Sequence, residues 1–210
     1  YALSFDGSND KVYVSDNVMT TNDLTFEVWV YPTNLSGWRT IRNENGWSNG
    51  DIHYQFANNK LEFSLKGNGP TDQWFDYTFS TNTWYHLAVV YDKANKWVKL
   101  YINGQLNQTK SYSSTRTANI GNFKFGRWDN SRPFAGMMSD FRIWDHVRTE
   151  SEIANNMNIR LNGDESGLVG YWKFDEGTGG TAHDISDLGN NGTISGATWT
   201  SDGLNFSISG

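Results

Sequence analysis

The 210-residue sequence predicts an all-β fold, a two-sheet antiparallel jelly-roll sandwich with one short helix near residues 150–158. Most segments alternate apolar and polar residues with a period of two, which is typical of half-buried strands. Clusters of Asn, Gly and Asp separate these segments and supply turns. Aromatic residues make up 15% of the chain, enough apolar area to offset the ordering entropy of folding.

Six segments show the alternation most clearly. Aromatic and β-branched residues dominate them, as expected for strands with one buried face. In chain order they are 11–15 (KVYVS), 24–32 (LTFEVWVYP), 51–56 (DIHYQF), 60–67 (KLEFSLKG), 84–92 (WYHLAVVYD) and 97–104 (WVKLYING).

Two short turns predict how some of these strands pair. Asn103 and Gly104 stand between "KLYI" and "QL", and both residue types tolerate the positive φ angles of a type I′ hairpin turn. The stretch "YDKANKW" predicts a second hairpin between 84–92 and 97–104. Many strands joined by turns, with few helices, favour an antiparallel sandwich or jelly roll.

One segment, "RTESEIANNMNIRL", breaks the strand pattern. Ile153 and Met157 lie four residues apart, and Thr149 with Glu152 fits a capping box. These features predict one helix near 150–158. The chain then returns to strand-and-turn character, and no tandem repeat of 20–50 residues is present.

Composition narrows the class of partner. The chain has 23 acidic and 17 basic residues, a net charge of −6, which disfavours a nucleic acid held by phosphate contacts. It has no cysteine, so disulfides and cysteine zinc sites are excluded. No run of 18 apolar residues occurs, so we expect no membrane insertion. The length suits one large β-sandwich.

Several stretches, in order, carry a resemblance to a known family. They are "ALSFDGSNDKVYVS", "LTFEVWVYP", "TWYHLAVVYD", "VKLYINGQL", "FAGMMSDFRIWDHVRTESEI" and "GLVGYWKFDEGTGGTAHDISDLGNNGTI". Together they resemble laminin-G-like, concanavalin A-like lectin/glucanase jelly-roll domains of the carbohydrate-binding-module type. The resemblance runs through nearly the whole chain. It implies two curved antiparallel sheets, one convex and one concave.

The resemblance also bears on domain organisation. The "GLVGYWKFDEG" block resembles a segment that precedes "ALSFDG" in many relatives, yet here it follows the helix. It could begin a truncated second repeat. We prefer a single domain over 1–210, with 163–210 closing the same sandwich, since no second "ALSFDG" follows. The abrupt start at "YALSFDG" leads us to expect that the chain is part of a larger multidomain protein. We expect the domain itself to be monomeric.

A structural calcium ion is a further expectation. The turn "FDGSND" brings Asp6, Asn9 and Asp10 together, and their oxygens suit a hard cation, although such turns are commoner without metal. The resemblance implies a calcium on the convex side that uses the first strand and the aspartate of a "D-x-R-x-aromatic" strand. Here that strand is "SDFRIW", so we expect Asp6 and Asp140 as metal ligands. Many relatives have another acid where this chain has Ser139.

Glycan hydrolysis needs two carboxylates at a defined separation. The resemblance implies that hydrolytic relatives carry E-x-D-x-(x)-E on one strand, and this motif is absent; Glu27 and Glu62 are isolated acids in their strands.

A lyase needs a Tyr or His base beside cations. The candidate residues are "HYQ" at 53–55 with Arg39, Arg42 or Lys66. Strand alternation puts Tyr54 on the face opposite His53, so this cluster is incomplete. No G-x-S-x-G, H-E-x-x-H or phosphate-loop motif is present. We therefore expect no enzymatic activity.

The strands 51–56 and 60–67 instead predict a polar platform. Ile52, Tyr54 and Phe56 alternate with polar residues and form an apolar side together with Leu61, Phe63 and Leu65. On the other side His53, Gln55, Glu62 and Ser64 are expected to face solvent. These groups supply the hydrogen-bond donors and acceptors that a sugar needs.

Tryptophans in loops can supply the ring that stacks on a sugar. The candidates are Trp38, Trp47, Trp74 and Trp128, of which Trp47 and Trp128 are expected to be the more exposed because Asn, Gly and Ser flank them. The segment "GRWDNSRP" adds donors, and we assign Arg127 and Asn130 to the site together with Arg39. As isolated charges, Arg39 and Arg42 are most often solvated. Five other tryptophans follow strand patterns and are expected to pack in the sheets: Trp29, Trp84, Trp97, Trp144 and Trp172.

These observations predict a non-catalytic domain that binds a glycan or polysaccharide, in a secreted or cell-surface protein. The source is expected to be bacterial, with the domain attached to a polysaccharide-degrading enzyme or an adhesin. A protein–protein or spacer domain without a sugar ligand is the alternative from another class. A glycan hydrolase or lyase is the third.

Overall fold

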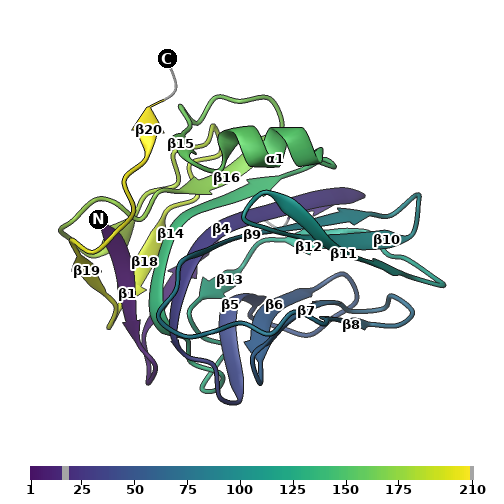
Figure 1. The fold of residues 1–210 in the computed structure, drawn as a ribbon, viewed down its shortest axis with the longest axis horizontal. Coiled ribbons are helices and arrows are strands. Elements are labelled where there is room, and N and C mark those ends of the chain that lie inside the picture. Colours follow the sequence, from purple (N-terminus) through teal and green to yellow (C-terminus); the bar gives the residue numbers. More distant parts are fainter. Residues whose placement is uncertain (16–18, 209–210) are drawn as a thin grey trace.

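The computed structural model describes residues 1–15 and 19–208 of the chain. In these residues two large antiparallel sheets pack face to face, and a single short helix lies on the outer side of one of them (Figure 1). This architecture confirms the predicted all-β sandwich.

Sheet A lies beneath the helix in Figure 1. Its strands are β1 (Ala2–Asp6), β4 (Asp23–Asn34), β9 (Tyr85–Asp92), β10 (Trp97–Ile102), β11 (Gln105–Ser111), β14 (Ala135–Trp144), β16 (Leu168–Trp172) and β19 (Thr198–Thr200). They follow the order β11-β10-β9-β4-β14-β1-β19, and β16 also pairs with β14.

Sheet B forms the lower layer. Its strands are β2 (Lys11–Val14), β5 (Trp38–Glu44), β6 (Ile52–Ala57), β7 (Lys60–Leu65), β8 (Asp72–Phe75), β13 (Phe123–Phe125), β17 (Thr181–Ala182) and β18 (Gly192–Ser195). They follow the order β17-β18-β2-β13-β5-β6-β7-β8. Its outer face, away from sheet A, is the lower surface in Figure 1.

Two small pairings complete the described strands. β3 (Met19–Thr21) pairs with β12 (Ala118–Ile120), and β15 (Ile159–Arg160) pairs in parallel with β20 (Ser207–Ile208). After the helix the chain contributes strands to both main sheets. β16 pairs with β14, β18 with β2 and β19 with β1.

The predicted hairpins are present. β10 and β11 meet at Asn103 and Gly104, whose φ angles of 51° and 80° are those a type I′ turn requires. β9 and β10 pair from Asp92 opposite Trp97.

The predicted helix is α1 (Glu150–Asn156). Thr149 and Glu152 form the reciprocal capping box, in which each side chain accepts a hydrogen bond from the other residue's backbone N–H. In the described residues no helix is long and apolar enough to span a membrane.

The core lies between the sheets and follows the alternation. Ile52, Tyr54 and Phe56 of β6 are fully buried there, as predicted. Phe26 of sheet A packs against Tyr54 with ring centroids 5.9 Å apart, and against Phe63 at 6.5 Å. Among the predicted sheet tryptophans, Trp29, Trp144 and Trp172 are buried, whereas Trp84 and Trp97 are half-buried.

Arg42 corrects one expectation, because it is fully buried rather than solvated. The β5–β6 register shifts between Thr40 and Arg42, so Arg42 lies opposite the inward-facing Tyr54. A one-residue bulge reverses the face to which the following side chain points. The Arg42 guanidinium pairs with Glu44 and lies over the Phe123 ring at 4.2 Å.

Candidate functional site

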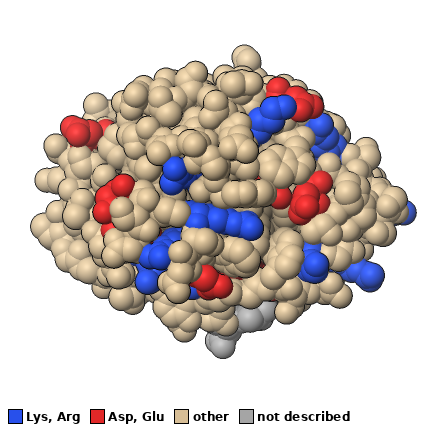
Figure 2. Space-filling model, turned by 90° about the horizontal axis from the view of Figure 1, so that it is seen from below, with Lys and Arg blue, Asp and Glu red and all other residues tan. Residues whose placement is uncertain are grey.

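The outer face of sheet B carries a hollow of about 310 Å³. Figure 2 views the molecule from this side. We call it the tryptophan hollow; its lining residues are Trp38, Trp47, His53, Gln55, Glu62, Ser64, Asp72, Trp128 and Arg132.

Cross-strand pairing builds the floor of the tryptophan hollow. His53 lies opposite Ser64, and Gln55 opposite Glu62, so these four side chains share the outer face. β8 extends the rows, with Asp72 opposite Ser64 and Trp74 opposite Glu62. The alternation that sends Tyr54 into the core therefore places polar groups on one patch outside.

Hydrogen bonds tie this floor together. Asn43 donates to Gln55 Oε1 at 3.1 Å, and Gln55 Nε2 donates to Glu62 Oε2 at 2.8 Å. The Ser64 hydroxyl donates to Glu62 Oε1 at 2.6 Å. Burial raises the pKa of Glu62, while the bonds from Ser64 and Gln55 favour its charged form. Since both Glu62 oxygens accept hydrogen bonds, the network holds the carboxylate in one orientation.

The floor differs from the predicted open platform. His53, Gln55, Glu62 and Ser64 do face away from the core, yet each is at most 4% exposed. The loops that carry Trp47 and Trp128 fold over them. The Trp47 ring stacks on His53 with centroids 3.9 Å apart, and the Trp128 ring lies 4.7 Å from His53.

His53 is held neutral in this position. Burial, together with the charges of Arg132 and Arg42, lowers its pKa to about 3. Unfolded His53 takes up a proton below its ordinary pKa of 6.5, but the folded state does not until the pH approaches 3. The contribution of His53 to stability is therefore present above pH 6.5 and is lost as the pH falls.

We expect His53→Gln to remove this pH dependence. Relative to the variant, the parent should lose up to about 1.4 kcal/mol of unfolding free energy per pH unit below pH 6. Urea unfolding between pH 7.5 and 5 measures the difference. The exposed His183→Gln is the matched control. If the unfolding free energies of the parent and His53→Gln change with pH in the same way, His53 is not the source of the pH dependence.

Arg132 forms one wall of the tryptophan hollow. Its guanidinium lies over the Trp38 and Trp128 rings, 4.4 Å from each centroid. It donates to Gln55 Oε1 at 3.2 Å and lies 3.4 Å from His53 Nδ1. No carboxylate of the described residues lies within 4.0 Å of it. A half-buried cation between two rings thus keeps donors for a ligand.

The structure separates the predicted site residues into two groups. Trp38, Trp47, His53, Gln55 and Trp128 line the tryptophan hollow, and Trp74 packs on Trp38 with centroids 5.5 Å apart.

The other predicted residues, Arg39, Arg127 and Asn130, do not line the hollow. Arg39 instead donates to the Pro133 carbonyl at 3.0 Å. Asp72 and Arg132 line the hollow without having been assigned to it from the sequence. Asp72 precedes Trp74 by two residues, a strand spacing that indicates a shared face.

The relative exposure of the tryptophans also differs from expectation. Trp38 and Trp74 are each 37% exposed, whereas Trp47 and Trp128 are half-buried against His53. The turn residues around Trp47 and Trp128 predicted exposed rings, but the loops bend back onto the sheet. The open aromatic surface at the hollow is therefore the Trp38–Trp74 pair.

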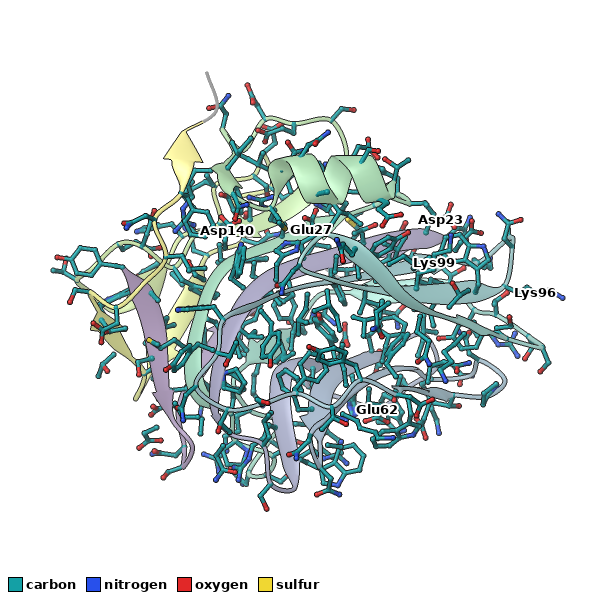
Figure 3. All side chains as sticks on the ribbon, in the orientation of Figure 1. Asp23, Glu27, Glu62, Lys96, Lys99 and Asp140 are labelled. Carbon is teal, nitrogen blue, oxygen red and sulfur yellow. The ribbon has the colours of Figure 1, made fainter. Side chains whose placement is uncertain are left out.

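The predicted calcium ligand Asp140 belongs to a buried ionic network instead. Its carboxylate pairs with Arg142 at 2.5 Å and Arg160 at 2.8 Å, and it accepts a hydrogen bond from the Tyr171 hydroxyl. Figure 3 shows Asp140 and Glu27 near α1, on the side of the molecule opposite Glu62. With two guanidinium partners, the Asp140 carboxylate does not fit a metal-ligand role.

Asp6 lies apart from Asp140. In the β1–β14 register Asp6 is opposite Ala135, five positions along β14 from Asp140. Asp6 accepts a hydrogen bond from the Ser8 backbone N–H, and its own N–H donates to Asp10. Asp6 and Asp140 therefore cannot share one ion. The described residues contain no group of three or more His, Asp or Glu side chains placed to hold a metal.

The comparisons with known proteins agree with this fold. A family model of laminin G type, described as the concanavalin A-like lectin/glucanases superfamily, matches residues 6–154. No curated protein gives a significant match.

Among solved structures, the chain is similar to a protein of Bacteroides ovatus ATCC 8483 that is named as a candidate carbohydrate-binding protein. The two are 25% identical with a TM-score of 0.77, over 94% of this chain and 58% of that one. The chain therefore spans little more than half the length of this relative.

Two further similarities show the fold alone. One is to the CBM40 domain of the Ruminococcus gnavus IT-sialidase bound to α2,3-sialyllactose, at 15% identity and TM-score 0.56, over 73% of this chain and 95% of that one. The other is to the botulinum neurotoxin serotype D ligand-binding domain in complex with N-acetylneuraminic acid. This pair is 21% identical with a TM-score of 0.59, over 79% of this chain and 44% of that one.

Proposed function

Because the chain belongs to the concanavalin A-like lectin/glucanase superfamily, we propose that it is a carbohydrate-binding domain that holds a glycan in the tryptophan hollow. One observation carries the proposal. Trp38, Trp47 and Trp128 surround a hydrogen-bonded polar floor on one face of sheet B. Sugar recognition needs this combination, a ring for the apolar face of a pyranose and oriented polar groups for its hydroxyls.

The parts of the site divide this work. Trp38 and Trp74 present the exposed ring surface. Arg132 offers donors, and the carboxylate of Asp72 offers acceptors at the rim. Because Gln55 and Glu62 are already locked by neighbouring hydrogen bonds, little side-chain entropy is lost when a ligand binds.

The same geometry favours binding over catalysis. Glu62 and Asp72 are two acids in one hollow, the minimum for glycoside hydrolysis. A general acid must present a proton to the leaving oxygen, however, and both Glu62 oxygens accept hydrogen bonds from Gln55 and Ser64. Glu62 therefore acts as a fixed acceptor of the floor.

The wider setting is also proposed. The Bacteroides ovatus relative is longer than this chain, which supports the view that the domain is one module of a larger secreted or surface protein. Fractionation of the source cells with an antibody to this domain tests it. A cytosolic band of this domain's own size would contradict it.

Affinity electrophoresis against a panel of neutral and acidic polysaccharides tests the proposed function. We expect at least one polymer to retard the domain, and Trp38→Ala and Trp128→Ala to reduce the retardation. Trp84→Ala is the matched control, because Trp84 is half-buried against Tyr31 away from the hollow. Absence of retardation by every polymer would favour a spacer or protein-binding role.

Glu62→Gln separates a binder from a hydrolase. Glutamine keeps the shape and one acceptor, so we expect a glycan bound by the parent to be bound within about fivefold by the variant. Neither protein should release reducing ends from that glycan. Sugar release by the parent that Glu62→Gln abolishes would show that the domain is an enzyme.

A further inference from the structure

A second hollow lies on the same outer face of sheet B, over β18, β2 and β13. It measures about 460 Å³, and we call it the lysine trough; its lining residues are Lys11, Tyr13, Asn45, Lys124, Thr193 and Ser195. Val12, Val14, Phe123 and Phe125 from the same strands are in the core. The alternation therefore turns Lys11, Tyr13 and Lys124 outward.

Strand register joins the lysine trough to the tryptophan hollow. Tyr13 lies opposite Lys124, Lys124 opposite Asn43, and Asn43 opposite His53. With strands about 4.8 Å apart, Tyr13 and His53 are roughly 14 Å apart along one row across the sheet. The row continues to Ser64 and Asp72. The loop that carries Trp128 contacts both hollows, because Trp128 lines the tryptophan hollow and Lys124 of the lysine trough pairs with Asp129 of this loop at 3.2 Å.

The lining of the lysine trough is basic, whereas the chain as a whole is acidic. The protein carries a net charge of −6, yet the residues that line the lysine trough include Lys11 and Lys124 and no Asp or Glu. Figure 2 shows Lys and Arg side chains over the centre and left of this face, on the side where Figure 1 places β18, with a few acidic side chains near them. Within the described part of the chain, the ammonium group of Lys11 makes no ion pair or hydrogen bond. The partner of Lys124 is a carboxylate that is 57% exposed, so a ligand anion can compete with it.

We propose that the glycan site extends from the tryptophan hollow across sheet B into the lysine trough, and that it takes an oligosaccharide bearing carboxylate or sulfate groups. The anionic groups lie over Lys11 and Lys124, with the Tyr13 ring beneath the sugar between them. This inference rests on the proposed function. A single sugar is too short to bridge the roughly 14 Å of three strand spacings, so the ligand is a chain.

The chemistry of lysine suits this role. An ammonium group is a mobile point charge with three donors, which accepts a carboxylate or a sulfate without requiring planar geometry. Attraction between exposed charges is screened beyond about 10 Å at 0.1 M salt. Binding of an anionic glycan should therefore weaken as salt increases, whereas stacking in the tryptophan hollow should not.

Two matched pairs of polymers test the inference by affinity electrophoresis. Polygalacturonate and its methyl ester differ in carboxylate charge, and dextran sulfate and dextran differ in sulfate charge. We expect at least one anionic polymer to retard the domain more than its neutral counterpart, and the pair concerned identifies carboxylate or sulfate. Lys11→Gln and Lys124→Gln should each weaken that binding about two- to fivefold. Lys96→Gln is the control, since Figure 3 places Lys96 at the far end of the molecule.

The outcomes separate this inference from the proposed function. If the charged and the neutral polymer of each pair retard the domain equally, and Lys11→Gln and Lys124→Gln are retarded as the parent is, the inference is overturned. Glycan binding itself would then remain supported. If Trp38→Ala and Trp128→Ala bind the anionic polymer as tightly as the parent does, the tryptophan hollow and the lysine trough do not form one site. If no polymer of the panel or the pairs binds, the proposed function fails and the inference with it.

Discussion

Arg132→Ala is expected to weaken glycan binding by about 30- to 100-fold, because a charged hydrogen-bond donor at a ligand is worth about 2–3 kcal/mol. The guanidinium also holds the Trp38 and Trp128 rings apart at 4.4 Å from each. Removing it takes away both a donor and the spacer that keeps the tryptophan hollow open. Isothermal titration with the best polymer of the panel measures the loss.

Arg132→Lys distinguishes the two contributions. Lysine keeps the charge but lacks the planar group that stacks between rings, so we expect an intermediate loss. Arg116→Ala, at an exposed arginine outside the hollow, should bind as the parent does. Parent-like affinity in Arg132→Ala would place the glycan elsewhere on the molecule.

Glu27→Gln is expected to lower the free energy of unfolding by about 3–5 kcal/mol, the cost of breaking a buried ion pair. Glu27 is fully buried and pairs with Arg148 at 2.9 Å, with His86 at 3.4 Å and with Arg142 at 3.8 Å. The neutral amide of the variant cannot balance the positive charges of the buried Arg148 and Arg142 guanidinium groups. Urea denaturation at pH 7 measures the loss, and the exposed Asp187→Asn is the control.

The pH dependence of the same variant provides an independent check. Burial alone would raise the pKa of Glu27, but the hydrogen bond to His86 and the charges of Arg142 and Arg148 lower it to about 2. The stability from Glu27 is thus present above pH 4.5 and is lost as the pH falls toward 2. The difference in unfolding free energy between the parent and Glu27→Gln should therefore decrease over that pH range. Since Figure 3 places Glu27 opposite Glu62, glycan affinity of the folded variant should be unchanged.

The polar floor illustrates how far sequence patterns reach. Alternation in 51–56 correctly assigned Tyr54 to the core and His53 to the other face of the sheet. Alternation cannot tell whether that other face is open, because the covering rings come from loops around Trp47 and Trp128. Exposure was therefore predicted wrongly for both the floor and the two rings.

Arg42 and Asp140 show two other limits. A single bulge in β5 turns Arg42 inward, and nothing in the local composition marks where the extra residue falls. Asp140 was expected beside a calcium ion, but Arg160 from β15 and Arg142 from its own strand occupy its oxygens. The position of Arg42 depends on the register between β5 and β6, and that of Asp140 depends on a partner twenty residues away in the chain.

Local spacing was enough for the strand character of most segments, the hairpin at Asn103 and the capped helix, because each depends on residues within a few positions of one another. The tryptophan hollow depends on pairing between strands. Trp38, Trp47, Trp74 and Trp128 come from four separate segments, and they meet because β13, β5, β6, β7 and β8 are consecutive neighbours in sheet B. A ring's surroundings are a property of strand order and loop path, so tertiary structure decided which tryptophans open to a ligand and that Arg132 stands between them.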